Sequence, residues 1–205
     1  MFILLLLIGF IQTAGPIPNT KPGHQLGNPS APISFELFVD LHCIDTADMF
    51  PNFLEAIEQK ISGKKIKDSV DITIHQFPLP YHRNSFYASQ MAYFIHQKHP
   101  ESYLDYCLLQ MKYLDKYNRA NDSTAEEIQN WLQQDATKAI KHFDPEVQTV
   151  FSNSQYDWQT RVAWKYAISR GVYGTPIAFI NRVVLDELPE SVEGLVKMFQ
   201  PYVKA

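Results

Sequence analysis

Cysteine is scarce in this sequence: among 205 residues there are only two, Cys43 and Cys107. Secreted proteins whose small cores depend on disulfides carry many more, so we expect this chain to be held together by side-chain packing. The two cysteines could pair once, and their positions in the sequence do not decide whether they do. A chain of this length is expected to form one domain, or one domain that carries an insertion.

An excess of charge is also missing. The chain has 18 Lys and Arg against 22 Asp and Glu, which gives a formal net charge of −4. This balance, without a basic stripe, gives no support for binding to nucleic acid or to an anionic membrane surface. The seven histidines and two cysteines form no H-x-x-x-H or C-x-x-C pair with the spacing of metal ligands, so no metal site is predicted.

Long apolar runs are absent apart from the first residues. Met1–Ile11 is almost wholly apolar, and small and polar residues follow up to Gly15, which predicts a signal peptide over residues 1–14. No Lys or Arg precedes the apolar core, so a buried strand or an uncleaved anchor is the alternative. The run is shorter than the roughly 20 residues that a helix needs to cross a bilayer. No second run is long enough, so no membrane span is expected after cleavage.

The residues up to position 77 predict an arm followed by a strand, a helix and a second strand. Residues 15–32 are rich in Pro, Gly, Asn and Lys and are expected to form an arm without regular structure. Residues 33–41 are rich in β-branched and aromatic residues, and residues 70–77 alternate between apolar and polar, so each is predicted to be a strand. Residues 43–60 predict a helix that Pro51 kinks.

The rest of the chain predicts a large helical block and a return to the sheet. Residues from about 83 to 170 contain no glycine and many helix-forming residues, and Ser123 with Glu126 has the spacing of a capping box. Strand character returns at residues 176–184, and an apolar stripe predicts a last helix over residues 191–203. This order of elements predicts an α/β fold.

The junction between the first strand and the first helix places Cys43 on the first turn of that helix. Unpaired N–H groups and the helix dipole there favour the thiolate, which is the nucleophilic form. A protonated His42 would add to this effect, the carboxylate of Asp45 would oppose it, and the hydroxyl of Thr46 can donate to the sulfur. The alternative is that Cys43 is a small core residue, as free cysteines often are.

The residues around this junction resemble a known family. Residues 27–32 read Gly-Asn-Pro-Ser-Ala-Pro, and Phe38, Asp40 and Cys43 follow. This arrangement resembles the opening of DsbA-like thioredoxin-fold proteins, which typically reads G-(N/D)-P-x-A-P and then F-x-D-x-x-C-P-x-C.

Three further segments extend the resemblance to nearly the whole mature chain. Residues 171–176 read Gly-Val-Tyr-Gly-Thr-Pro and are followed by Asn181, which is similar to the family segment G-V-x-G-T-P-x-x-x-x-N. Pro51 occupies the place of the family's kink proline, and the Pro-Leu-Pro-Tyr-His stretch at residues 78–82 precedes the helical insertion. The resemblance implies a thioredoxin-like fold over residues 33–205, with a central mixed sheet and a large all-helical insertion at about 83–170.

Two departures from the family pattern bear on chemistry. Thr46 replaces the second cysteine, so the motif is C-x-x-T, and Ile44 replaces the proline after the first cysteine. A single thiol can only form a mixed disulfide that another thiol must resolve. The family's buried acid falls on Leu37, and Glu36, on the opposite strand face, is not an obvious substitute. Cys107 could supply the missing thiol, or it could be a packed core residue.

The resemblance implies monothiol thiol–disulfide exchange on polypeptides of the secretory pathway, in the endoplasmic reticulum lumen or outside the cell. Cys43 would be the nucleophile and Thr46 its hydrogen-bonding partner, while His42, Thr175 and Pro176 would contact the substrate, with a cis peptide bond before Pro176. No cofactor is expected, although glutathione could serve as a co-substrate. Two alternatives stay open: a redox-inactive scaffold that binds a peptide or protein partner, and a glutathione-transferase-like enzyme. The oligomeric state is not predicted.

Overall fold

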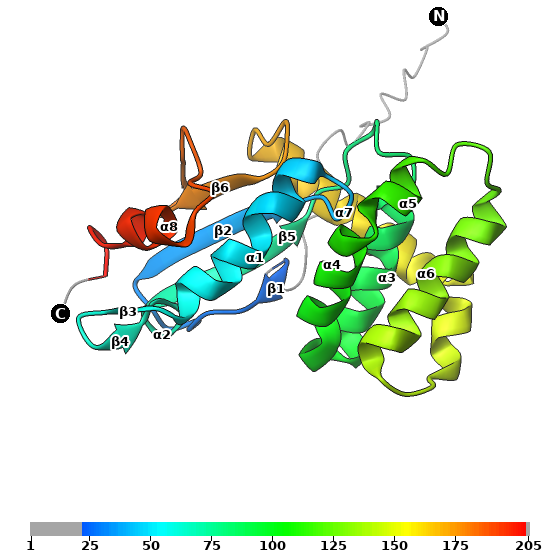
Figure 1. The fold of residues 1–205 in the computed structure, drawn as a ribbon, viewed down its shortest axis with the longest axis horizontal. Coiled ribbons are helices and arrows are strands. Elements are labelled where there is room, and N and C mark those ends of the chain that lie inside the picture. Colours follow the sequence, from blue (N-terminus) through cyan, green and yellow to red (C-terminus); the bar gives the residue numbers. More distant parts are fainter. Residues whose placement is uncertain (1–21, 204–205) are drawn as a thin grey trace, which may run out of the picture.

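The structure is a computed structural model that describes residues 22–203 of the chain. The predicted signal peptide and the first part of the predicted arm lie outside the described residues. Within them the chain forms one mixed sheet, helices on both of its faces, and a separate helical block to one side (Figure 1). The predicted α/β class with a thioredoxin-like sheet and a helical insertion is therefore confirmed.

The sheet has five strands in the order β1-β5-β2-β6-β7. The central strand, β2, runs parallel to its neighbour β5, while the other three pairings are antiparallel. The strands span His24–Gln25 (β1), Ile33–Val39 (β2), Val70–Gln76 (β5), Ile177–Ile180 (β6) and Val183–Val184 (β7). Strand β1 corrects the prediction that residues 15–32 lack regular structure. It is only two residues long and is fixed by pairing with β5, so no local pattern marks it.

Alternation along β2 divides the core between the two faces of the sheet. Phe35, Leu37 and Val39 are buried on one face, which helices α1 (Ile44–Glu58) and α8 (Val192–Phe199) cover. Phe38 is buried on the other face, in a second apolar cluster that includes residues of helix α7. Between α1 and β5 lie a small hairpin, β3 (Lys60–Ile61) and β4 (Lys64–Lys65), and the short helix α2 (Ile66–Ser69).

The helical block is inserted between β5 and β6 and matches the predicted insertion. It consists of α3 (Ser85–Lys98), η1 (Pro100–Ser102), α4 (Tyr103–Lys112), α5 (Leu114–Asn118), α6 (Ala125–Ile140), η2 (Pro145–Ser152) and α7 (Ser154–Ser169). Helix α6 does begin with a capping box, but Thr124 and Glu127 form it, one residue later than predicted. The sequence offers both registers, because a hydroxyl residue and a glutamate stand three apart twice in succession.

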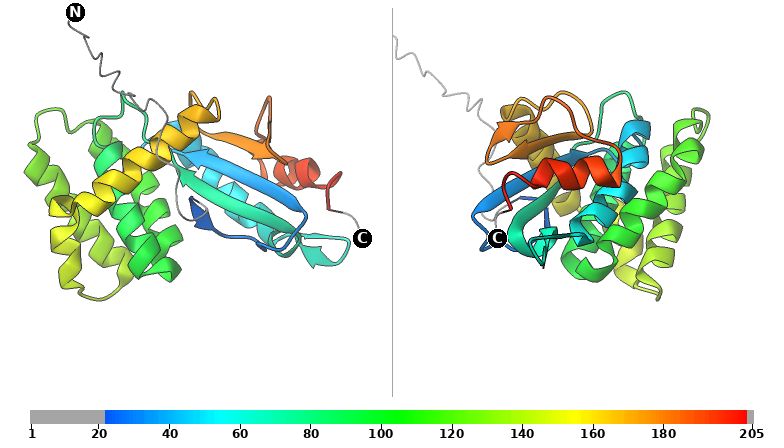
Figure 2. Two further views of the ribbon diagram at one scale, coloured as in Figure 1. Left: turned by 180° about the vertical axis from the view of Figure 1, so that it is seen from behind. Right: turned by 60° about the vertical axis from the view of Figure 1, so that its left-hand side comes forward.

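Helix α7 joins the block to the sheet. It packs against α3 in the block and against β5 in the sheet. Figure 2 shows it crossing the face of the sheet that lies opposite α1 and α8. One continuous helix therefore carries the chain from the insertion back to the fold that it interrupts.

A pair of histidines joins the edge strand β1 to the helical block. The Nδ1 atoms of His24, in β1, and His96, in α3, lie 2.9 Å apart, and the ring of His24 is stacked on Tyr103 at 3.9 Å. Burial and the neighbouring His96 lower the pKa of His24 to about 4, and burial also lowers the pKa of His96. Both imidazoles are therefore neutral near neutral pH, so one Nδ1 atom can donate and the other accept.

This pair is expected to make the fold sensitive to mild acid. Below pH 6.5 an unfolded chain protonates His24, whereas the folded chain resists protonation down to about pH 4, so stability is lost across that window as the pH falls. We expect His24 to account for about 1 to 2 kcal/mol of the loss between pH 7 and pH 5. Urea unfolding at both pH values should show a smaller loss for His24→Gln than for wild type, with exposed His142→Gln as the control. An unchanged pH dependence in His24→Gln would contradict this expectation.

Candidate functional site

Cys43 is the residue that caps the N-terminus of α1, one position before the first helical turn. Its backbone is extended (φ −85°, ψ 129°), and its carbonyl accepts the first helical bond, from the Ala47 N–H at 3.0 Å. The side chain is 5% exposed. Its thiol donates to the carbonyl oxygen of Thr175 at 3.3 Å. The sulfur is therefore at the start of the helix, as predicted, but in contact with a loop from the far end of the chain.

That loop holds the two predicted substrate-binding residues from the C-terminal part. The Thr175–Pro176 peptide bond is cis, and β6 begins at Ile177. Because β6 pairs with β2, the loop arrives next to the residues that follow β2, including Cys43. A pocket of about 260 Å³ opens beside Thr175 and Pro176. The structure thus brings Cys43, Thr175 and Pro176 together across more than half of the sequence.

Thr46 lies one helical turn after Cys43 and is fully buried. Among residues 22–203 its hydroxyl has no hydrogen-bond partner, and the same is true of the buried hydroxyl of Thr175. In the protonated thiol state, Thr46 therefore makes none of the contact with the sulfur that we predicted for it. Buried hydroxyl groups without a hydrogen-bond partner are unusual. Thr46 is three residues after Cys43 in the chain, and Thr175 is the residue whose carbonyl accepts from the thiol.

His42 faces the helical block instead of the site opening. It is fully buried, its ring is stacked on Tyr117 at 4.6 Å, and its Nε2 lies 3.2 Å from Oε1 of Gln110. Burial lowers its pKa to about 4 in spite of the nearby Asp40 carboxylate, so His42 is neutral at pH 7 and adds no positive charge. The predicted contact of His42 with a substrate would require this packing to open.

Asp40 organises the approach to Cys43 from inside the protein. Its buried carboxylate accepts from the backbone N–H groups of His42 and Leu79, both at 2.8 Å, and from the Ser85 hydroxyl at 2.6 Å. The Nδ1 atom of His82 lies 2.8 Å from it. One side chain therefore joins the end of β2 to the residue before Cys43, to the loop after β5 and to the start of α3. The sequence showed Asp40 only as a letter of the motif, and not this role.

The surroundings of the thiol are apolar. Cys43 belongs to the cluster on the α7 face of the sheet, which also contains Phe38, Phe77, Leu79 and Phe179. Three large apolar side chains are exposed on segments that contribute to the site, next to Cys43, two residues after Leu79 and two residues before Thr175. These are Ile44, which is 60% exposed, Tyr81 at 71% and Tyr173 at 87%. These three exposed side chains, on the start of α1 and on two loops, are called the apolar rim below.

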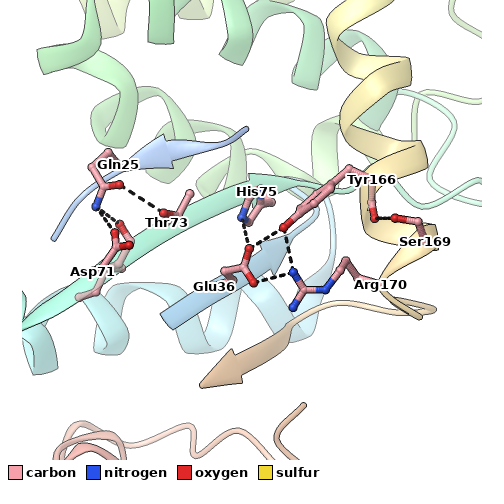
Figure 3. A network of polar contacts seen from close by, with 9 residues as sticks. Gln25, Glu36, Asp71, Thr73, His75, Tyr166, Ser169 and Arg170 are labelled. Atoms are coloured by element: carbon pink, nitrogen blue, oxygen red, sulfur yellow. Dashed lines mark hydrogen bonds and ion pairs between the residues drawn. The ribbon is translucent and has the colours of Figure 1, made fainter. Parts of the chain in front are cut away.

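Glu36 lies on the α7 face, where its side chain points towards Tyr166 and Arg170 (Figure 3). Leu37 is buried on the opposite face, which α1 covers. The carboxylate of Glu36 accepts from the Tyr166 hydroxyl at 2.6 Å, lies 3.5 Å from His75 Nε2 and pairs with Arg170 at 3.0 Å. Burial would raise its pKa, but the hydrogen bonds from His75 and Tyr166 lower it to about 2. Glu36 is therefore held as a carboxylate and carries no proton near neutral pH.

Cys107 lies in the other apolar core. It is fully buried in α4, and burial raises the pKa of its thiol to about 12. Both cysteines are free. Cys107 belongs to the cluster that packs α1, α3 and α4 together, whereas Cys43 belongs to the cluster on the α7 face. The packed-core alternative therefore describes the place of Cys107 in this structure.

Residues 22–203 contain neither a candidate metal centre nor a candidate membrane-spanning helix. In that part of the chain no group of three or more His, Cys, Asp or Glu side chains could hold a metal ion. No helix there is long and apolar enough to cross a membrane.

Comparison with known proteins gives one family and a set of similar folds. The profile of a family described as Thioredoxin matches residues 19–199. A search of curated proteins gave no match. Similar solved structures include DsbA from Chlamydia trachomatis (16% identity, TM-score 0.65, covering 90% of this chain and 92% of that one). Others are α-DsbA1 from Wolbachia pipientis (19%, 0.66, 92% and 91%) and oxidised BdbD from Bacillus subtilis (17%, 0.63, 94% and 98%).

Proposed function

Because this chain belongs to the thioredoxin family and has a DsbA-like thioredoxin fold, we propose that it takes part in thiol–disulfide exchange through Cys43. The observation that carries the proposal is the position of the sulfur, at the N-terminus of α1 and 3.3 Å from the carbonyl oxygen of Thr175. A helix N-terminus stabilises a thiolate, and a loop beside it offers polar backbone groups to a substrate.

The proposed reaction uses one thiol. The thiolate of Cys43 attacks one sulfur of a substrate disulfide, the new S–S bond forms as the old one breaks, and the leaving thiolate takes up a proton from solvent. A second thiol, from the substrate or from glutathione, then attacks the mixed disulfide and releases Cys43. Thr46 has no thiol, so the protein cannot resolve the mixed disulfide through a second cysteine in its own motif.

Two hydroxyl groups are available to stabilise the thiolate. Once Cys43 loses its proton it no longer donates to the Thr175 carbonyl, and it becomes an acceptor. The buried hydroxyls of Thr46 and Thr175, which have no partner among residues 22–203, can then donate to the sulfur. The freed carbonyl of Thr175 is available to an N–H group of an extended polypeptide. Leu37 has no acidic group and Glu36 is already ionised near neutral pH, so neither residue can carry the proton.

The proposed substrates are polypeptides of the secretory pathway. The apolar segment Met1–Ile11, predicted to be a signal peptide, supports that location. The rim of Ile44, Tyr81 and Tyr173 supports a polypeptide with apolar side chains near its cysteine. A second candidate function is a redox-inactive scaffold that binds a polypeptide at the same rim. The 5% exposure of Cys43 and the missing second cysteine favour it.

A single-turnover experiment separates these two functions. A peptide whose cysteine is activated as a mixed disulfide with a coloured leaving thiol is added to wild type, Cys43→Ser and Cys107→Ala. We expect wild type and Cys107→Ala to release one equivalent of the leaving thiol and to retain the peptide, while Cys43→Ser reacts no faster than buffer. Release of the leaving thiol at the same rate by wild type and Cys43→Ser would exclude the exchange reaction. Equal binding of the peptide by these two proteins, without release of the leaving thiol, would support the scaffold.

A further inference from the structure

A second groove adjoins the cluster that holds Cys43. It has a volume of about 430 Å³ and lies between the loop after β5, the start of α3 and one side of α7. Its lining consists of Pro78, Leu79, Pro80, His82, Arg83, Phe86, Arg161, Trp164 and Lys165. Leu79 and Trp164 also pack in the Cys43 cluster, so one end of the groove shares side chains with the site.

The lining combines an apolar floor with positive charge. Five of its side chains are proline, leucine, phenylalanine or tryptophan, and none of its residues is acidic. Arg161 lies over the Phe86 ring at 5.1 Å, and Asp157 neutralises it through two hydrogen bonds of 2.7 and 3.1 Å. Its contribution to the groove is therefore mostly its apolar stem.

Arg83 and Lys165 keep their charge. Arg83 donates to the backbone carbonyls of Ala120, Asn121 and Ser123, which hold the guanidinium in place without neutralising it. Lys165 is exposed on α7. Within residues 22–203 neither cation has an acidic partner. Two uncompensated cations over an apolar floor stand out on a chain whose net charge is −4.

We propose that this groove binds an acidic and apolar segment of the substrate polypeptide, next to the cysteine that reacts with Cys43. Apolar side chains of the segment would cover Phe86 and Trp164, and a carboxylate would pair with Lys165 and Arg83. The inference rests on the proposed function for the role of the peptide, but the groove and its charges exist independently of the thiol.

Equilibrium binding tests the groove without thiol chemistry. The protein is Cys43→Ser, and the probes are three labelled peptides without cysteine: one with alternating Glu and Leu, one with Gln in place of Glu, and one with Ser in place of Leu. We expect the first to bind about fivefold more tightly than either of the others at low salt, and the difference from the Gln peptide to vanish at high salt.

Two variants of exposed lysines locate the effect. In the same Cys43→Ser background, Lys165→Gln is expected to weaken binding of the acidic peptide by about threefold, whereas Lys60→Gln, on β3 and outside the groove, leaves it unchanged. Lys165 is preferred to Arg83 because its removal frees no buried carbonyl. Equal affinity for the three peptides, or an equal effect of the two variants, would overturn the proposal. Decanoate, a small amphiphilic anion, tests a different occupant of the groove. If decanoate displaces the peptide and Lys165→Gln weakens decanoate binding as well, the groove is a site for such anions and the proposal is overturned.

Reaction rates separate this proposal from the proposed function. Wild-type protein is mixed with cysteine-containing, activated forms of the acidic and the Gln peptides. A faster reaction with the acidic form supports the groove and the exchange reaction together. Equal rates would overturn the groove and leave the exchange reaction standing. Binding of the acidic peptide to Cys43→Ser without any reaction in wild type would support the groove and exclude the exchange reaction.

Discussion

Replacing Asp40 with alanine is expected to lower the free energy of unfolding by about 3 to 5 kcal/mol. The carboxylate is fully buried and accepts from the N–H groups of His42 and Leu79 and from the Ser85 hydroxyl. Its loss also leaves the Nδ1 atom of His82 without its carboxylate partner. A buried donor without an acceptor costs about 1 to 3 kcal/mol, and alanine leaves several at once.

Urea denaturation measures this effect, and two variants control it. Asp45→Asn changes an exposed acid on the first turn of α1, five residues away, and is expected to shift stability by no more than about 0.5 kcal/mol. Asp40→Asn keeps one acceptor oxygen and should fall between wild type and Asp40→Ala. If Asp40→Ala unfolds with the same midpoint as Asp45→Asn, the carboxylate does not hold this junction together.

The second large effect is expected at Glu36. Glu36→Ala removes the acceptor of Tyr166 and the partner of Arg170, both of which lie against the α7 face of the sheet. The remaining cation and hydroxyl stay partly buried, so we expect a loss of about 2 to 4 kcal/mol. The matched control is Glu58→Ala. Glu58 also contacts two cations, Lys65 and Lys67, but it is exposed, and its loss is expected to cost less than about 1 kcal/mol.

Acid gives an independent measure of the same carboxylate. The folded-state pKa of Glu36 is about 2, well below that of an unfolded glutamate at about 4.3. The stabilisation is therefore complete above that unfolded value and is lost as the pH falls towards 2. The difference in stability between wild type and Glu36→Ala should shrink over that range. A difference that stays constant down to pH 2 would mean that the loss comes from packing and not from the charge.

Much of the fold could be predicted from local patterns in the sequence. The strand at residues 33–41, the helix with Pro51 and the strand at residues 70–77 were predicted within two residues at each end, because each has its own period of apolar residues. The same holds for the extent of the helical block. The position of Cys43 followed from the boundary between two such elements, which is a local property.

Contacts between distant segments could not be predicted in the same way. The burial of His42 depends on Tyr117 and Gln110, which belong to the helical block. The charge state of Glu36 depends on His75 in the neighbouring strand β5, and on Tyr166 and Arg170, which are more than a hundred residues later. Nothing in the spacing of these residues along the chain indicates that they meet. The charge states of His42 and Glu36 therefore depend on how the helical block packs against the sheet, and not on the sequence motif around Cys43.

The insertion of the helical block also determines when the site comes into being. Ile180 of β6 pairs with Phe35 of β2, and the whole block lies between β5 and β6 in the chain. Joining ends across a long loop costs little extra entropy, roughly 0.6 kcal/mol for each doubling of its length, but contacts distant in sequence form slowly. During synthesis β1, β2, α1 and β5 can associate while Thr175 is still inside the ribosome. A nascent chain that has not yet released Thr175 therefore presents Cys43 without the loop that contacts its thiol in the folded protein.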